Sequence, residues 1–368
     1  MSEKQEHPFR FWFNHIEGSR DGCTIIAVGP KRSPHPNTPL LKSNGKFPQR
    51  SSIMSFLQIR EFTSRWLARC VPPPPVLRPY PGWRLGTGER ESGRLSIEWR
   101  RRVWNNAVST PVLTTWLDGL NVYAYPGNET SRAIFVTGYY EPNEFFMLAQ
   151  IFRPGMIFVD VGANMGLYTI FAARKIGERG TVLAIEPSTR ECGRLLKNVQ
   201  ANSLLNVRLV RKAVSDSRSD VDLLVAEDRW SGHNTLGAFA YDVPLATKET
   251  VRTERLDDIV LREGLSHVDV VKLDVEGAEL LALKGAAGIL ERFRPMVLLE
   301  VSDRALCHQG CNSAQIWDFC RQRGYQIFAF DQRTGLPVPA QQRPYYDSEN
   351  VVAVPDSYEP AAAWRIAP

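Results

Sequence analysis

The feature that most constrains the fold is a regular alternation of short apolar segments with amphipathic helical ones, which begins after Arg153-Pro154-Gly155. The apolar segments are continuous runs rich in Val, Ile and Leu, which is typical of parallel strands that helices cover on both faces. These expected strands occupy residues 156–161, 182–185, 207–210, 268–273, 296–301, 325–330 and 351–354. The pattern predicts an α/β fold with a doubly wound, mostly parallel, Rossmann-like sheet.

The segments between the expected strands have the periodicity of amphipathic helices. These helices are expected over residues 167–176, 191–202, 279–292 and 316–323. Two further strands are expected upstream, over residues 120–124 and 133–136. After them, Glu141-Pro142-Asn143-Glu144 has the acidic, proline-containing composition of a helix start and predicts a helix over residues 145–152.

The N-terminal part of the chain has a different composition. Residues 1–53 are rich in Pro, Ser, Lys and Arg and show no apolar period, which predicts a disordered basic tail. A helical pattern opens at Met54, an alternative native start, and ends at the Pro-rich spacer 72–75. We assign residues 54–118 to this helix, the spacer and a linker, as a small N-terminal α/β extension. Residues 119–368 form the main domain.

The excess of positive over negative charge lies in the N-terminal part of the chain. The net charge is +5, with 18 Lys and Arg against 8 Asp and Glu in residues 1–104, and 27 against 32 in residues 105–368. An excess of Lys and Arg over Asp and Glu in one segment does not by itself indicate nucleic-acid binding. We therefore expect no specific nucleic-acid partner for the main domain.

The composition favours a cytoplasmic protein with reduced thiols. The mean hydropathy is −0.26, and no apolar run approaches the roughly 18 residues that a membrane-spanning helix requires. The N-terminus lacks the apolar core of a signal peptide. The six cysteines are scattered and form no disulfide framework. We expect no transmembrane segment, and the sequence leaves the oligomeric state open.

The most informative segment runs from Asp160 to Gly166, where a buried strand passes through a glycine-containing turn into a helix. Small residues in such a turn let a ligand approach the backbone, and the helix N-terminus presents free N–H groups. Glu186 ends the next strand, 26 residues after Asp160. A carboxylate at that place can accept both hydroxyls of an adenosine ribose.

Two ligand classes use this geometry, and a packing turn without a ligand is the third alternative. A dinucleotide site has the pattern G-x-G-x-x-G, whereas this turn has Gly162 and Gly166 with three residues between them. The acid Asp160 just before the turn would also repel a pyrophosphate. An acid there suits the sulfonium and ammonium of S-adenosylmethionine, which is the ligand that the turn favours.

Four blocks of the sequence resemble the FkbM-type methyltransferases, a group of class I S-adenosylmethionine-dependent enzymes. The blocks are F-V-D-V-G-A-N-M-G-L-Y-T (158–169), A-I-E-P-S (184–188), V-V-K-L-D-V-E-G-A-E (270–279) with L-K-G-A (283–286), and M-V-L-L-E-V (296–301). The resemblance covers residues 119–301 and extends toward 354, and residues 1–118 carry no part of it.

The resemblance implies a cofactor along the carboxyl ends of the first two parallel strands. The turn residues would line its methionine and ribose side, Glu186 would hold the ribose hydroxyls, and the segment after the third strand would face the adenine. The implied cofactor-binding residues are Asp160, Gly162, Ala163, Asn164, Gly166, Glu186, Ala213 and Val214. For Ala213 and Val214, ordinary packing at the end of a strand is an equal alternative.

The segment Asp274 to Glu279 follows the fourth strand, where an open α/β sheet places its ligands. Asp274 is a candidate for accepting the proton of an acceptor hydroxyl, and Glu276 is a candidate for contacting the substrate. Glu279 is expected to cap the next helix. Carboxylate oxygens suit Mg²⁺, which the sequence therefore allows without requiring any metal.

Three further residues are candidates for the site. His233 lies in a polar loop and could act as a general base, although the sequence shows no residue that would orient it. Glu141 and Glu144 precede the cofactor strand and could lean over the site as part of a lid, where they could bind the cofactor ammonium. A role as helix-start acids is the alternative for both.

The function expected from these residues is S-adenosylmethionine-dependent methylation of a hydroxyl on a sugar, a glycan or a secondary metabolite. An NAD-dependent oxidoreductase would share the fold class, but the missing third glycine disfavours it. A non-catalytic protein that binds a nucleotide, RNA or a membrane is the other alternative, and it depends on the basic N-terminal third.

Overall fold

The computed structural model describes residues 24–26, 79–80 and 94–358. The expected basic tail lies outside the described residues except for the three-residue strand β1 (Thr24–Ile26), which pairs antiparallel with the edge of the main sheet. The helix expected from Met54 and the Pro-rich spacer also lie outside them.

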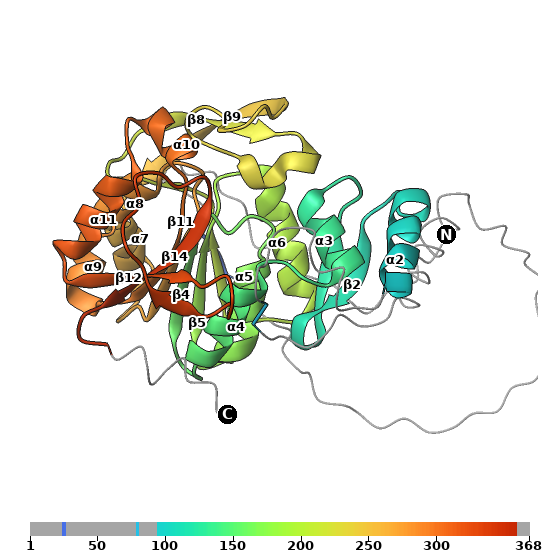
Figure 1. Ribbon diagram of the computed structural model, residues 1–368, viewed down its shortest axis with the longest axis horizontal. Helices are drawn as coiled ribbons and strands as arrows, with labels where there is room; N and C mark the ends of the chain where they lie inside the picture. The colour runs from blue at the N-terminus through green and yellow to red at the C-terminus, as the bar shows by residue number, and fades with distance from the viewer. Residues whose placement is uncertain (1–23, 27–78, 81–93, 359–368) are drawn as a thin grey trace, which may run out of the picture.

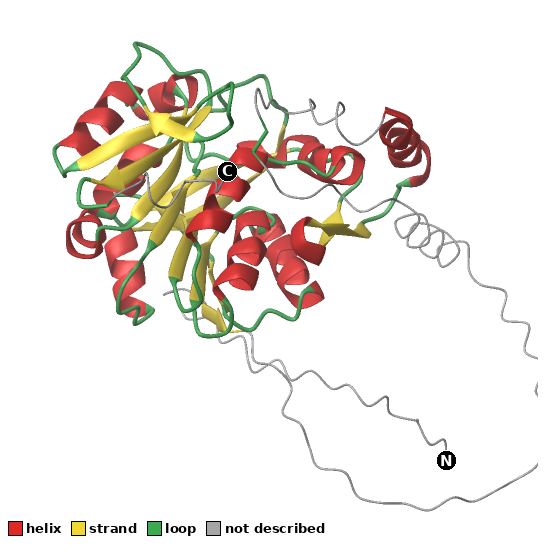
Figure 2. Cartoon of the chain, turned by 60° about the horizontal axis from the view of Figure 1, so that its bottom comes forward, coloured by secondary structure: helices red, strands yellow, loops and turns green. Residues whose placement is uncertain are grey.

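One mixed sheet forms the centre of the molecule, and among the described residues its strand order is β1-β6-β5-β4-β10-β11-β14-β12-β13 (Figures 1 and 2). Five central strands are parallel, and β1, β14 and β13 are antiparallel to their neighbours. The bounds are β4 Ile157–Val161, β5 Thr181–Ile185, β6 Val207–Val210, β10 Val270–Leu273, β11 Met296–Val301, β12 Tyr325–Phe330, β13 Pro337–Pro339 and β14 Glu349–Pro355. The expected doubly wound, mostly parallel sheet is confirmed.

Helices cover both faces of this sheet, because successive residues of each buried strand point into two different cores. Phe158 packs in one core with α4, α5 and α6. Its neighbour Val159 packs in the other core with α7, α8, α9 and α11. The bounds are α4 Pro142–Ile151, α5 Leu167–Ile176, α6 Thr189–Ala201, α7 Leu256–Arg262, α8 Glu279–Gly285, α9 Ala287–Phe293, α10 Asp303–Leu306, η4 Cys307–Gln309 and α11 Ser313–Arg321.

A small layer stands beside the sheet, at the right of Figure 1, and spans the boundary expected at residue 119. We call this layer, residues 94–137, the N-terminal extension from here on. It consists of α2 Arg94–Ala107, β2 Val112–Trp116, η2 Leu117–Gly119, β3 Leu120–Ala124 and α3 Glu129–Thr137. The strand expected over residues 133–136 is wrong, since these residues belong to α3. Asn128 caps this helix by accepting the Ser131 N–H, and Gly138 ends it in the left-handed conformation. A short apolar run does not distinguish a strand from a buried helix.

The single helix expected over residues 279–292 is also wrong, because α8 and α9 meet at a break at Ala286. Gly285 packs against a neighbouring turn so closely that an added Cβ would lie 2.1 Å from the Ser215 carbonyl oxygen. The carboxylate of Asp257 then caps the new helix by accepting the N–H groups of Gly288 and Ile289.

A small second sheet rises above the carboxyl ends of the main strands (Figure 1). It contains β7 Ala213–Val214, β8 Asp220–Ala226 and β9 Leu245–Glu254, with the short helix η3 Asp228–His233 after β8. His233 is therefore the last residue of a 3-10 turn that overhangs the main sheet.

Candidate functional site

A large cavity lies where the strand order of the sheet reverses, between the carboxyl ends of the parallel strands β4 and β10. Ligands of open α/β sheets bind at such a point. The cavity has a volume of about 960 Å³. A smaller pocket adjoins it beside the end of β5, and both share Gly162, Asn164 and Asp274 in their walls.

The turn after β4 depends on its glycines. Gly162 has φ +75°, and an added Cβ there would lie 1.7 Å from the carbonyl oxygen of Asp274. Gly166 has φ +87°, and its Cβ would lie 2.7 Å from Cγ of Leu195. Between them, Asn164 also adopts the left-handed region, with φ 50°. The turn therefore brings the end of β4 directly against the end of β10.

Glu186 lies at the end of β5 and lines the smaller pocket together with Ala213 and Val214. Its Oε2 accepts the Asn164 N–H at 2.8 Å, and its Oε1 accepts the Ser188 N–H at 2.9 Å. Burial raises the pKa of Glu186 to about 8, against the opposing effect of these two N–H groups. A fixed carboxylate beside a partly apolar pocket is what a hydroxyl-bearing ligand needs.

The structure places Asp160 behind the wall of the cavity. Its side chain is fully buried and lines neither pocket. Oδ2 accepts a hydrogen bond from Thr169 Oγ1 at 2.6 Å, while Oδ1 has no partner among the described residues. Burial raises the pKa of Asp160, and the charge of Lys272 on the neighbouring strand opposes this rise. Gly166 also lies outside both walls.

Lys272 is a wall residue that the sequence analysis did not select. It is buried in β10, and its Nζ lies 2.9 Å from Oδ2 of Asp274 and 4.8 Å from the ring centroid of Tyr168. Burial would lower the pKa of Lys272, but the negative charges of Asp274, Asp160 and Glu141 raise it above its ordinary value. A lysine within the apolar strand V-V-K-L-D was the signal that could have identified it.

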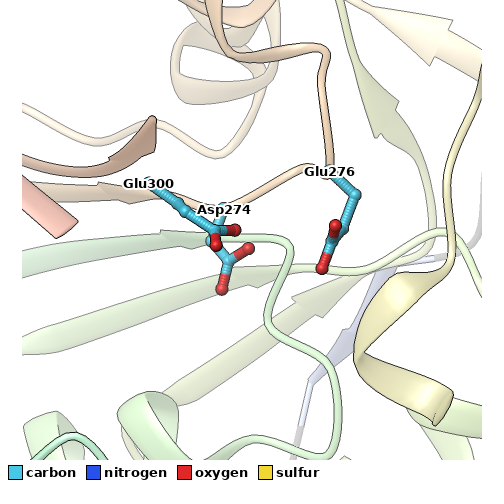
Figure 3. Close-up of side chains that lie close together, drawn as sticks. All are labelled: Asp274, Glu276 and Glu300. Carbon is cyan, nitrogen blue, oxygen red and sulfur yellow. The ribbon is translucent and has the colours of Figure 1, made fainter. Parts of the chain in front are cut away.

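Three carboxylates from two adjacent strand ends meet at one side of the cavity (Figure 3). Asp274 follows β10, Glu276 lies in the next turn with φ 50°, and Glu300 lies in β11. Their oxygen atoms lie within 4.8 Å of one another. Burial raises the pKa values of Glu276 and Glu300 well above the usual range, and neighbouring carboxylates, Asp274 among them in both cases, add to this. Hard cations prefer such oxygen donors, but acidic groups also cluster without an ion, and we assign none.

Glu141 and Glu144 also line the cavity. Glu141 accepts a hydrogen bond from the Tyr168 hydroxyl at 2.6 Å. Asn350 of β14 donates to Glu144 at 3.1 Å and to Glu141 at 3.4 Å. Burial, followed by the charge of Glu141, raises the pKa of Glu144 to about 8. Tyr168 and Asn350 are further wall residues that sequence reasoning missed, since Asn350 is 206 residues from Glu144 along the chain.

His233 faces the carboxylate cluster from η3. Its Nδ1 lies 3.5 Å from Oε1 of Glu276, and its ring lies between those of Trp230 and Tyr241, with centroids 6.0 Å and 5.4 Å away. Burial lowers the pKa of His233, and the charge of Asp274 opposes this. The imidazole is therefore neutral near pH 7. The structure supplies the neighbouring carboxylate that the sequence did not reveal.

A chain of hydrogen bonds connects the glycine turn, residues 162–166, to the N-terminal extension. The side chain of Asn128, which caps α3, donates to the Asp228 carbonyl at 2.8 Å and to Ser231 Oγ at 2.7 Å. The side chain of Asn164 donates to the Ser231 carbonyl at 3.2 Å. The extension, η3 and the glycine turn are thus connected through Asn128, Ser231 and Asn164, respectively.

The structure brings most of the sequence-selected residues to the two pockets. The larger cavity takes Glu141, Glu144, Gly162, Ala163, Asn164, His233, Asp274 and Glu276. The smaller pocket takes Glu186, Ala213 and Val214 in addition to residues that it shares with the cavity. Glu279 accepts the N–H groups of Val275 and Gly277, which lie in the turn before α8, so it orders this turn and does not cap the helix as expected.

Across the described ranges, no helix is both long and apolar enough to cross a membrane. The four cysteines in the described part of the chain, Cys192, Cys307, Cys311 and Cys320, are free thiols.

Comparison with known proteins identifies the family of the central region. Residues 160–327 match the model of the methyltransferase FkbM domain. Methyltransferase sdnD of Sordaria araneosa is 32% identical over 153 residues, which are 34% of this chain and 59% of that protein. The 2-O-methyltransferase NoeI of Sinorhizobium fredii is 27% identical over 172 residues, which are 42% of this chain and 66% of that protein.

A solved structure of a similar protein is also known. A methyltransferase FkbM from Methylobacillus flagellatus KT aligns at 16% identity and a TM-score of 0.35, over 61% of this chain and 54% of that one. The chain spans only about 59% of the length of sdnD. Residues 160–327, which contain the end of β4 and the parallel strands β5, β6, β10 and β11, therefore match the FkbM domain of methyltransferases.

Proposed function

We propose that the protein is an S-adenosylmethionine-dependent O-methyltransferase whose acceptor is a hydroxyl of a sugar, a glycan or a secondary metabolite. The observation that carries this proposal is the pair of joined pockets at the carboxyl ends of β4, β5 and β10 in an FkbM domain. One pocket has the features of a nucleoside site, and the other is large enough for a second molecule.

The residues that line the smaller pocket suit the adenosine part of the cofactor. Glu186 presents a carboxylate whose oxygens are each fixed by one backbone N–H, which leaves lone pairs for two ribose hydroxyls. Ala213, Val214 and Leu223 supply an apolar wall for the base. When bound, S-adenosylmethionine supplies a methyl group on a positively charged sulfur, and carboxylates around the adjoining cavity favour such a ligand.

The larger cavity fits the acceptor. Its volume of about 960 Å³ lies within the range of small-molecule sites. Its wall is rich in carboxylates, amides and tyrosines, which suits an acceptor with several hydroxyl groups. The name of NoeI describes a 2-O-methyltransferase, which supports oxygen as the methylated atom here.

The residues of the wall have two tasks in this reaction. They hold the acceptor hydroxyl in line with the methyl group, and such orientation accounts for much of the acceleration in group-transfer reactions. One of them also accepts the hydroxyl proton. Asp274 and His233 are the candidates, and Lys272 already occupies one oxygen of Asp274. No metal is needed for either task, and the oxygen cluster of Asp274, Glu276 and Glu300 leaves Mg²⁺ compatible with the site.

Calorimetric titration with S-adenosylhomocysteine tests the proposal. We expect the wild type to bind and Glu186→Ala to bind about tenfold to hundredfold more weakly, because a buried polar group that loses its hydrogen-bond partner costs about 1–3 kcal/mol. Asp160→Ala should also weaken binding, acting through Lys272 and the turn. Glu291→Ala, at an exposed site on α9, is the control. Circular dichroism verifies folding of each variant.

The same experiment separates the alternatives. A wild type that binds NAD and not S-adenosylhomocysteine would show that the protein is an oxidoreductase of the same fold class. A protein that binds neither, and loses RNA or vesicle binding when residues 1–53 are removed, would be a non-catalytic binding protein. Methyl transfer that survives this deletion would make the tail accessory.

A further inference from the structure

The Nδ1 atom of His233 has an unusual environment. It is buried and makes no hydrogen bond within the described part of the chain. A buried ring nitrogen without a partner is costly. The carboxylate oxygen Oε1 of Glu276 lies 3.5 Å away, close enough for a small side-chain rotation to form the missing hydrogen bond. Catalytic hydrogen bonds are often long in an unliganded enzyme and shorten when the substrate binds.

The backbone holds Glu276 beside the ring. Its left-handed φ of 50° is fixed by a hydrogen bond from Thr235 Oγ1 to its carbonyl oxygen at 2.8 Å. The next residue, Gly277, packs so tightly that an added Cβ would lie 2.5 Å from the Ala305 carbonyl oxygen. Glu276 therefore has little freedom to move away from η3.

His233 is held from its other sides. Trp230 and Tyr241 flank its ring, and the guanidinium of Arg304 lies over Tyr241 at 4.9 Å. The His233 side chain is 30% exposed and lines the large cavity. Nδ1 is the buried nitrogen of a ring that lines the cavity, which leaves Nε2 as the nitrogen available to a ligand there.

We propose that Glu276 is a positioning residue that accepts a hydrogen bond from Nδ1–H of His233 and so leaves Nε2 unprotonated toward the cavity, as the general base of the reaction. This inference rests on the proposed function. Which nitrogen of a histidine carries the proton is set by the partner of the other nitrogen. Asp274 is less suited to this task, because Lys272 donates to it at 2.9 Å.

The proton balance of the step is simple. The O–H bond of the acceptor breaks, an N–H bond forms at Nε2, and the carboxylate of Glu276 stabilises the imidazolium that results. The oxygen keeps the electron pair of its O–H bond and uses it to bond the methyl group, and the sulfonium donor leaves as a neutral thioether. The imidazolium then loses its proton to solvent.

Selective ¹⁵N labelling of histidine, with two-bond ¹H–¹⁵N correlation spectra of the full chain, tests the inference without an acceptor. Spectra of His233→Gln assign the His233 signals. In the wild type we expect the neutral ring to carry its proton on Nδ1. In Glu276→Asn the side chain is too short to reach the ring, and asparagine tolerates the left-handed backbone. We expect this variant to shift the proton to Nε2, which is the preferred position in free histidine.

The His233 pKa gives a second readout, which a purely structural role of Glu276 would not change. Loss of the carboxylate should lower this pKa by about one. Glu349→Gln is the matched control, because Glu349 lines the same cavity but pairs with Arg343. It should leave both the tautomer and the pKa of His233 unchanged.

Two outcomes would overturn the inference. One is a wild-type ring with its proton on Nε2, which is the result expected if a protonated Glu276 donates to Nδ1. The other is an Nδ1–H tautomer and a pKa that do not change in Glu276→Asn. Titration of the same samples with S-adenosylhomocysteine distinguishes a failure of the role of Glu276 from a failure of the proposed function. If the wild type binds it, either outcome rejects only the role of Glu276, whereas absence of binding rejects the proposed function.

Discussion

At the scale of the residue, Lys272 balances the charges of the cavity wall. Lys272 lies opposite Asp160 of β4, which is fully buried. Its Nζ contacts Asp274, which follows the carboxyl end of β10. A buried charge needs a compensating partner, because desolvation otherwise makes it very costly. One lysine therefore neutralises an internal carboxylate and fixes an accessible one.

Removal of Lys272 should destabilise the fold. We expect Lys272→Met to lower the free energy of unfolding by about 3–5 kcal/mol, because it leaves Asp160 buried without a counter-charge. The double variant Lys272→Met/Asp160→Asn should recover part of this loss, since the uncompensated charge is gone. Urea denaturation measures both. A double variant no more stable than Lys272→Met would contradict the pairing.

Glu186 should make stability depend on pH. Its pKa is raised to about 8 in the folded protein, whereas an unfolded glutamate has a pKa of about 4.3. The folded state therefore holds the proton more tightly, and the stability that this contributes is complete below about pH 4 and is lost as pH rises toward 8. We expect Glu186→Gln to reduce the fall in unfolding free energy between pH 5 and 8.

Urea denaturation at three pH values across this range measures the effect, with Glu291→Gln on the surface of α9 as the control. Equal slopes for the wild type and Glu186→Gln would show that the pKa of Glu186 is not raised.

At the scale of the element, the sequence predicted correctly those helices and strands whose bounds depend on residues close by in the chain. The strands over residues 207–210, 296–301 and 325–330 and the helix over 167–176 have the bounds expected from their apolar runs. The helix α3 was mistaken for a strand because its short apolar run has no visible period. The break between α8 and α9 was missed because its causes, Ser215 and Asp257, lie far away in the chain.

The same distinction applies to the site. The glycine turn and the acids after β10 have local patterns, so their positions at the cavity could be anticipated. Glu300, Asn350 and Tyr168 have no such pattern, and only the sheet order brings them to the wall. The contact between His233 and Glu276 spans two loops and could not be inferred from spacing along the chain.

The close packing of α8 gives a prediction at this scale. Gly285→Ala should lower the free energy of unfolding by about 1–3 kcal/mol, because its Cβ would meet the Ser215 carbonyl. Gly193→Ala in the middle of α6 is a matched control with the opposite sign. Its Cβ would have nothing within 4 Å, so the higher helix propensity of alanine should stabilise the protein by about 1 kcal/mol. Thermal unfolding of both variants checks the difference, and equal effects would refute the packing argument.

At the scale of the molecule, the N-terminal extension takes part in the site through Asn128. This residue caps α3 and also supports η3 through Asp228 and Ser231, whose backbone holds Asn164 of the glycine turn. The extension is therefore joined by hydrogen bonds to Asn164, a wall residue of both pockets, although it lies beside the main sheet (Figure 1).

Loss of this link should weaken cofactor binding. We expect Asn128→Ala to cost about 1 kcal/mol of stability as a lost helix cap, and also to reduce S-adenosylhomocysteine affinity several-fold. Asn312→Ala removes the capping box of α11, which lines neither pocket, so it should cost similar stability without changing affinity. Calorimetric titration distinguishes the two, and equal affinities for both variants would show that the link is not functional.

The large cavity crosses both boundaries of the family match. Its wall includes Glu141 and Glu144 before residue 160, and Ser348 and Asn350 after residue 327. The smaller pocket, by contrast, is lined entirely from within residues 160–327. Under the proposed function, the part shared by the family handles the donor, while flanking segments shape the space for the acceptor. Evolution can then exchange one without the other, so members with the same donor site can diverge in the molecules they modify.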